Sequence, residues 1–261
     1  MGGYDRAECE WGEFLMSVYL TDSADMTSVA NAIRTKGGTS AQLAFPAGFV
    51  SAVQAIPSGG DITVEAIAKN QKPSGPIVIT GTTIGEYAFA CKPITNVQAD
   101  NVTSIGTYAF HNCTSFGTAI FPLWQGTTTS NNYTFQKIGN GNAVVVLPAL
   151  KNAGSRMFTQ SKIKAVDIGP NFSSILADTF YQTGGSQVTK NLILRRTAGV
   201  VTASTTDSIK AVQNLWVPEA LVDSYKAATN WSTRINGGYI TVHAIEGSIY
   251  ENAYADGTPI T

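Results

Sequence analysis

Residues able to do chemistry are few in this chain, and they are scattered. The sequence has two histidines, His111 and His243, and three cysteines, and none of them lies in a Cys-x-x-Cys or His-Glu-x-x-His spacing. The Gly-x-Ser-x-Gly motif of hydrolases and the Gly-Lys-Ser/Thr loop that binds phosphate are also missing from the sequence. The sequence therefore predicts no catalytic residue, no metal ligand and no cofactor.

Two acidic residues are the best candidates for an enzymatic alternative. Glycoside hydrolysis needs two carboxyl groups on either side of the scissile bond, and Asp167 and Asp178 could supply them. Acidic side chains scattered over a surface more often keep a protein soluble. We therefore predict a non-enzymatic protein, and a glycan-cleaving activity is the least favoured hypothesis.

Partner binding is predicted at the variable positions of a repeat in the middle of the chain, because repeat proteins present extended surfaces there. The candidate partner-binding residues are Glu86, Gln98, Thr107, His111 and Asn112, together with Trp124 and Tyr133 from an irregular segment at 122–145. For Trp124 the favoured alternative is that its indole fills an interrupted core, since large aromatic side chains are mostly buried. For His111 a solvated or capping role is favoured over metal binding.

The repeat is clearest in two copies. Ile84–Phe89 reads Ile-Gly-Glu-Tyr-Ala-Phe, and Ile105–Phe110 reads Ile-Gly-Thr-Tyr-Ala-Phe, 21 residues later. A period of this length is typical of coils that bury their apolar residues only by stacking on their neighbours. Phe89 and Phe110 would then lie one above the other in a shared core, where such ring pairs add about 0.5–1.5 kcal/mol to area burial.

The local pattern predicts how each coil is built. The isoleucine and alanine of the motif are four residues apart, which favours a short helical turn. Gly85 and Gly106 are expected where the backbone turns sharply with a positive φ. Val97 and Ala99 precede a turn pair and predict a short strand. Weaker copies begin at Ala153 and Ile175, and Ile77–Ile79 is predicted to be the strand of a partial first coil.

These residues resemble the BspA-like, or Treponema-type, leucine-rich repeat, whose units run Ile-Gly-x-x-Ala-Phe-x-x-Cys-x-x-Leu-x-x-Val. The resemblance implies an α+β solenoid of short strands and short helical turns. Cys91 and Cys113 occupy matching places in adjacent coils. We expect two small buried hydrophobic residues there, and a disulfide between the coils is the less favoured alternative.

The sequence also predicts helices and a strand on either side of the repeats. Thr27 to Gly38 and Pro46 to Pro57 predict two short helices. This segment resembles the helical module at the head of tail and appendage proteins of phages and prophages of Gram-positive bacteria. After the repeats, Leu215–Val217 predicts a strand and Pro218–Glu219 opens a helix; this unit resembles the closing unit found after BspA-like repeats and is a candidate cap. The tail from Glu246 is expected to be exposed or bound to a partner.

The expected organisation has three parts. Residues 1–60 form an N-terminal helical attachment module, residues 61–214 form the repeat solenoid with its irregularity at 122–145, and residues 215–261 form the C-terminal cap and tail. Charged residues make up 13% of the chain and the net charge is −1, which argues against binding to nucleic acid or to an anionic membrane. The sequence has no run of 18 apolar residues and no evident secretory signal.

The leading hypothesis combines the two resemblances. It is a structural protein of a phage virion, in the tail, baseplate or head fibre, whose first module binds other virion proteins and whose repeats bind a host surface glycan or protein or a neighbouring subunit. The alternative is an adhesin of the bacterial cell surface that carries the same repeats. Whether the chain forms a homo-oligomer stays open, because the sequence has no sustained heptads.

Overall fold

The computed structural model describes residues 75–126, 132–183 and 188–260. The chain divides into two units, Met1–Pro73 and Ser74–Thr261, and every described residue lies in the second. The predicted helical module at 1–60 lies outside the described residues and stays a prediction. None of the helices in the described part is long and apolar enough to cross a membrane.

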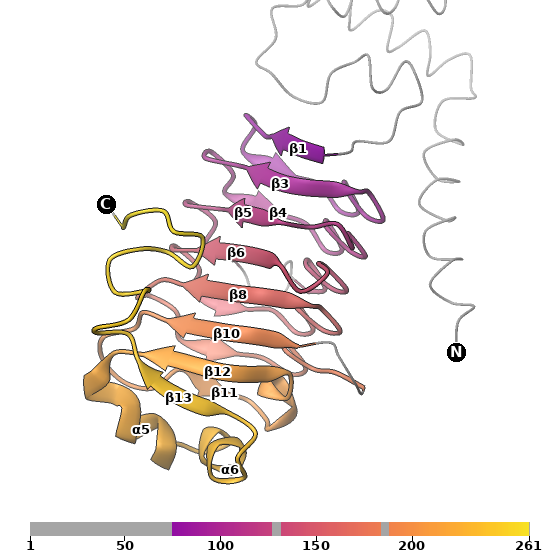
Figure 1. Ribbon diagram of the computed structural model, residues 1–261. Coiled ribbons are helices and arrows are strands. Elements are labelled where there is room, and N and C mark those ends of the chain that lie inside the picture. The colour runs from indigo at the N-terminus through magenta and orange to yellow at the C-terminus, as the bar shows by residue number, and fades with distance from the viewer. Residues whose placement is uncertain (1–74, 127–131, 184–187, 261) are drawn as a thin grey trace, which may run out of the picture. The chain divides into compact units, whose positions relative to one another are not determined.

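Parallel strands stacked in chain order dominate the described unit (Figure 1). Each strand of the main sheet is followed by one winding of chain, here called a coil, that returns to the next strand on the same side. Every pairing in this sheet is parallel. The eight strands are, in order, β1 (Gly75–Val78), β3 (Ile94–Gln98), β5 (Thr118–Ile120), β6 (Ala143–Leu147), β8 (Ile163–Ile168), β10 (Thr189–Leu194), β12 (Val212–Val217) and β13 (Thr241–Ala244).

Five strands of two residues form a second side of the coils in the described part of the chain. β2 (Thr83–Ile84) pairs with β4 (Ser104–Ile105), and β9 (Ser174–Ile175) lies between β7 (Asn152–Ala153) and β11 (Thr202–Ala203). The second residue of each of these strands is buried, so this side closes the core opposite the main sheet.

The third side is a turn segment, and it is not the helical turn that the sequence predicted. Tyr87 and Cys91 have φ of 54° and 59°, and the equivalent Tyr108 and Asn112 have 58° and 56°. Left-handed residues four apart interrupt the hydrogen-bond ladder of a right-handed helix. The amide of Phe89 donates instead to the carbonyl of Ala109 in the next coil, at 2.8 Å. The turn segments are therefore joined from coil to coil, as the strands are.

The two repeat glycines do not have the positive φ that we expected, since neither lies in the left-handed region. At Gly106 the reason for glycine is close packing between coils. A Cβ there would lie 2.6 Å from the amide nitrogen of Glu86 and 2.8 Å from the carbonyl carbon of Gly85, in the preceding coil. At Gly85 a Cβ would meet nothing within 4 Å.

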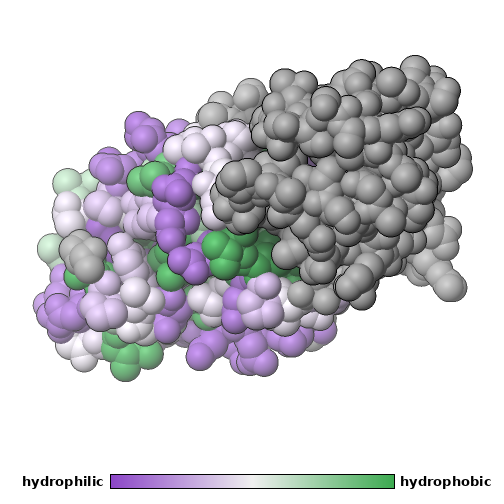
Figure 2. Space-filling model, turned by 90° about the horizontal axis from the view of Figure 1, so that it is seen from above, coloured by the Kyte–Doolittle hydropathy of each residue, from purple (hydrophilic) through white to green (hydrophobic). Residues whose placement is uncertain are grey.

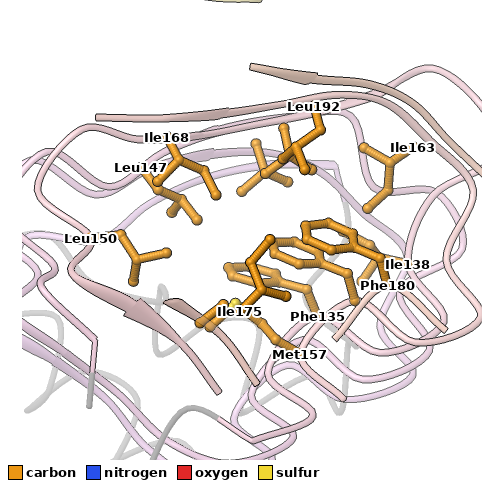
Figure 3. Close-up of a cluster of buried hydrophobic side chains, with 14 of the residues drawn as sticks. Phe135, Ile138, Leu147, Leu150, Met157, Ile163, Ile168, Ile175, Phe180 and Leu192 are labelled. Atoms are coloured by element: carbon orange, nitrogen blue, oxygen red, sulfur yellow. The ribbon is translucent and has the colours of Figure 1, made fainter. Parts of the chain in front are cut away.

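The predicted phenylalanine ladder is present and longer than the two clear repeats. It contains one ring per coil, from Phe89, Phe110, Phe135, Phe158 and Phe180, and each is at most 3% exposed. Neighbouring rings are stacked, with centroids 5.1–5.4 Å apart. Aliphatic side chains from the strands fill the space beside the rings (Figure 3).

The irregular segment at 122–145 contributes a coil of its own. Phe135 lies between Phe110 and Phe158 in the ladder, and β6 follows in register with β5 and β8. Trp124 is 2% exposed and packs against Phe135, with centroids 6.0 Å apart. The described part of the segment is therefore an eroded coil, and Trp124 fills the core.

The inward cysteine of the clear repeats is a free thiol. Cys113 is fully buried and donates to the carbonyl of Phe89 at 3.0 Å. A disulfide between Cys91 and Cys113 is therefore contradicted. Burial raises the pKa of the Cys113 thiol to about 12, so the thiol is neutral at physiological pH. Cys91 is half-buried.

Short helices follow the last coils. The 3-10 helices η1 (Asp207–Ile209) and η2 (Glu219–Leu221) precede α5 (Val222–Ala227) and α6 (Trp231–Asn236). Tyr225 and Trp231 are fully buried against the end of the main core. The side chains of Tyr225 and Trp231 both form hydrogen bonds with the backbone of Val201. The Val201 amide donates to the Tyr225 hydroxyl at 3.0 Å, and the Val201 carbonyl accepts from Trp231 Nε1 at 2.8 Å.

Candidate functional site: a row of tyrosines on the turn face

The structure brings most of the predicted partner-binding residues to one side of the coils. Glu86, Thr107, His111, Asn112 and Tyr133 all lie in the turn segments of three successive coils, which we call the turn face. Glu86 is exposed, Thr107, Asn112 and Tyr133 are half-buried, and His111 is buried. Gln98 lies apart from them, exposed on β3 of the main sheet, and Trp124 lies in the core.

A continuous row of side chains runs along the turn face. Tyr87 stacks on Tyr108 with ring centroids 4.9 Å apart and planes at 10°, and Tyr108 stacks on Tyr133 at 4.6 Å and 18°. Arg156 continues the row, with its guanidinium carbon 5.7 Å from the Tyr133 ring centroid. Asp178 ends it. We call these five residues the tyrosine row.

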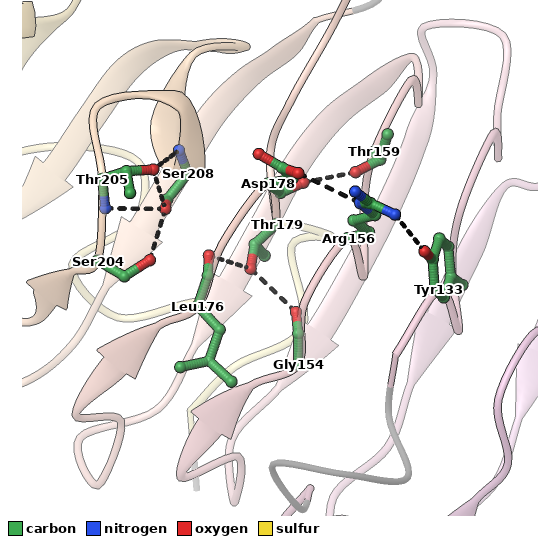
Figure 4. A network of polar contacts seen from close by, with 10 residues as sticks. All are labelled: Tyr133, Gly154, Arg156, Thr159, Leu176, Asp178, Thr179, Ser204, Thr205 and Ser208. Atoms are coloured by element: carbon green, nitrogen blue, oxygen red, sulfur yellow. Dashed lines mark hydrogen bonds and ion pairs between the residues drawn. The ribbon is translucent and has the colours of Figure 1, made fainter.

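Polar contacts fix the far end of the row (Figure 4). Arg156 donates from Nη1 to the Tyr133 hydroxyl and from Nε to Asp178 Oδ2, the latter at 3.2 Å. The hydrogen bond to Tyr133 and then the one to Asp178 raise the pKa of the Arg156 guanidinium, so it stays charged. The row thus has an uncharged part of three phenols and a paired, charge-compensated end.

The backbone that builds the core also builds this row. Each member lies two residues before a phenylalanine of the inner ladder, and each has a φ of 54–58°. The amides of Tyr87, Tyr133 and Arg156 donate to carbonyls of the following coil. Equivalent residues are therefore held one above the other, and stacking follows from the coil spacing.

The three tyrosines of the row are partly exposed. Tyr87 is 50% exposed, whereas Tyr108 and Tyr133 are half-buried between their stacked neighbours. Tyrosine combines a large apolar area with a hydrogen-bonding tip, and it is enriched in binding surfaces. The turn face is therefore suited to polar and aromatic contacts. Figure 2 shows hydrophilic residues beside apolar patches on one surface of the described residues.

The comparisons with known proteins concern the repeats. Residues 78–191 match the sequence model of the BspA type leucine rich repeat region, in six copies. No curated protein matches the chain. The BspA-type repeats include all five members of the tyrosine row, and repeats of this type are typically non-enzymatic binding modules.

The two carboxylates considered for catalysis lie on different sides of the coils. Asp167 lies on β8 of the main sheet and is bound by Arg195, and Asp178 lies on the turn face and is bound by Arg156. Each carboxylate has its own arginine. Within the described ranges, no three or more His, Cys, Asp and Glu side chains are grouped so that they could hold a metal ion.

Of the five members of the row, the sequence predicted only Tyr133 as a partner-binding residue. Tyr87 and Tyr108 recur with the same 21-residue interval as the core phenylalanines, and the interval alone does not tell which ring faces outward. Arg156 and Asp178 take the tyrosine position in the weaker copies. Aligning the repeat copies with one another could have revealed the row. In that alignment the residue type changes at the tyrosine position, while the phenylalanine two residues later stays constant.

Proposed function

We propose that the protein is a non-enzymatic component of a phage virion, in the tail, baseplate or head fibre, and that it binds a host surface receptor through its turn face. The observation that carries the proposal is the tyrosine row: three outward phenols, stacked at 4.6–4.9 Å and held by the repeat backbone. Rigid, pre-stacked tyrosines lose little conformational entropy on binding, which favours affinity.

In this proposal the repeats form a solenoid that serves as a rigid scaffold. The unit after β12, with α5, α6 and their buried Tyr225 and Trp231, would cap its end, because the last coil of a repeat array needs its apolar residues covered. The N-terminal module would attach the scaffold to other virion proteins, as its resemblance to appendage proteins suggests.

The location of the protein tests the first half of the proposal. Antibodies against residues 75–260 should detect the protein in phage particles purified from an induced lysogen. Detection in the cell-wall fraction and never in purified particles would contradict a virion role and would favour the alternative, a cell-surface adhesin with the same repeats.

Adsorption to cells tests the second half. A chain carrying Tyr87→Asn, Tyr108→Asn and Tyr133→Asn should bind host cells at least about tenfold more weakly, because hot-spot aromatic residues each contribute about 2 kcal/mol or more. Asparagine suits the left-handed backbone of these positions. The matched control is Gln98→Ala, on the main sheet, which should leave cell binding unchanged. Equal binding by the triple variant would remove the turn face from the proposal.

A further inference from the structure

A second, smaller apolar cluster lies on the outward face of the main sheet, separate from the core. It is formed by Val144, Val146, Ala165 and Ile193 from β6, β8 and β10, together with Ile245 and Tyr250 from the C-terminal segment. In Figure 1 this segment, in yellow, runs from β13 back toward β6. We call residues 246–260 the tail. The tail was expected to be exposed or bound to a partner; Glu246, Gly247, Ile249, Glu251 and Asn252 are exposed, whereas Tyr250 is only 6% exposed.

An ion pair on the sheet holds the tail by its backbone. Arg195 binds Asp167 through two hydrogen bonds of 2.8 Å. The same guanidinium donates to the carbonyls of Tyr250 and Ala253, at 2.9 and 2.7 Å. Asp167 in turn accepts from the amide of Ala255 at 2.9 Å. These contacts are made to main-chain groups of a segment built of turns, so they do not depend on the side chains at those positions.

Aromatic side chains fix the position of the tail on the sheet. The Tyr250 ring packs edge-on against Trp216 of β12, with centroids 5.0 Å apart, and the Tyr254 ring lies over the Arg195 guanidinium at 5.7 Å. Trp216 is itself stacked on His243 of β13, at 4.4 Å. The main sheet thus contacts the tail through the ring of Trp216 and through the ion pair of Arg195 and Asp167.

The main core does not depend on the tail. Its buried members end at Ile240, and none of them belongs to the tail. The strands beneath the tail are joined to one another by continuous parallel pairing from β6 to β12. Burial raises the pKa of Asp167, and the hydrogen bonds and charge of Arg195 oppose that shift. Without the tail, water would solvate this pair. The tail therefore resembles a ligand laid on a finished fold.

We propose that the outward face of β6, β8, β10 and β12 is a binding site for a peptide that folds into turns as the tail does, with Arg195, Asp167 and Trp216 as its binding residues. The tail is its present occupant. The chemistry of recognition is an aromatic residue, two carbonyls three residues apart, and an amide two residues further on. A second copy of the tail, offered as a free peptide, satisfies the same contacts.

The experiment uses the full chain with a protease site inserted between Gly247 and Ser248, next to exposed Glu246 and Gly247. After cleavage of the folded protein, a labelled peptide of residues 248–261 is added and its binding is followed by fluorescence anisotropy. The cleaved protein should keep a cooperative unfolding transition and should bind the peptide saturably, with one peptide per chain.

Peptide variants test the contacts without altering the protein. An Ala255→Pro peptide lacks the amide that Asp167 accepts and should bind at least about tenfold more weakly, since hydrogen bonds to charged groups are strong. A Tyr250→Ala peptide should also bind more weakly. The matched control is an Ile249→Ala peptide, because Ile249 is 81% exposed, and it should bind as the unmodified peptide does.

Three results would overturn the proposal. Loss of the unfolding transition on cleavage would make the tail part of the fold. A folded, cleaved protein that does not take up the labelled peptide, by binding or by exchange with its own segment, would show that no peptide site exists. Equal affinity for the Ala255→Pro and Ile249→Ala peptides would show that the backbone contacts are not what holds the tail.

Discussion

The repeats carry two parallel rows of stacked side chains that face opposite ways. The inner row has five phenylalanines with centroids 5.1–5.4 Å apart, and the outer row begins with three tyrosines at 4.6 and 4.9 Å. Each outer residue lies two positions before its inner counterpart. The stacking geometry is the same, but the inner rings are at most 3% exposed, while Tyr87 is 50% exposed.

The difference lies in what each row tolerates. The inner row keeps phenylalanine through all five coils, because a dry interior packs closely and each ring is in contact with the next. The outer row changes from tyrosine to Arg156 and then to Asp178 without interrupting the stack of coils. Stacking in the outer row is therefore not needed for the fold, which is consistent with the binding role proposed for this row.

The largest effect is expected from breaking the inner row at its centre. Phe135→Ala removes a ring stacked on both neighbours and should lower the free energy of unfolding by about 3–5 kcal/mol, as for other truncated core aromatics. Urea denaturation followed by circular dichroism measures this loss. A loss below about 1 kcal/mol would show that the ladder is not what holds the coils together.

A smaller difference in stability is expected between substitutions of two glycines, Gly85 and Gly106, that occupy the same position of the repeat. Gly106→Ala places a methyl group against the backbone of the preceding coil and should cost about 1–3 kcal/mol, as overpacking does. Gly85→Ala is the matched control, since nothing lies within 4 Å of its Cβ position, and it should be neutral or slightly stabilising. Equal losses at both positions, measured by thermal unfolding, would contradict the close approach of the coils at Gly106.

The stability of the protein at alkaline pH tests how well the core around Cys113 excludes water. The folded state raises the pKa of Cys113 from 9.0 to about 12, so the stability that comes from keeping the thiol neutral is complete below pH 9 and is lost as the pH rises toward 12. Between pH 8 and pH 10 the loss should be on the order of 1 kcal/mol. Denaturation curves of the unmodified chain and of Cys113→Ala, measured at both pH values, give the difference. The same decline in both proteins would assign it to other groups.

The sequence predicted the inner row better than anything else. A 21-residue interval of Gly, Tyr, Ala and Phe is enough to place equivalent rings in adjacent coils. The coil around Phe135 was harder to predict because it lacks the Ile-Gly start. The left-handed turn segments were mistaken for helical turns, since Ile and Ala spaced by four also fit a helix.

The outward features were the least predictable. Residues on a surface need not be apolar, so the sequence pattern does not mark them. The repeat spacing of Tyr108 and Phe110 is the same and does not show which of the two side chains faces the core. The contacts of the tail join residues far apart in the chain, such as Asp167 and Ala255. Such contacts depend on strand register across several coils, which local patterns do not encode.

The most direct test compares neighbouring members of the two rows in the same coil. Phe110→Ala and Tyr108→Asn are measured side by side for their free energies of unfolding in urea. We predict a loss of about 3–5 kcal/mol for Phe110→Ala and of about 1 kcal/mol or less for Tyr108→Asn, because asparagine tolerates the left-handed backbone and a half-buried ring contributes less. Equal losses would contradict the central claim that the inner row, and not the outer row, builds the fold.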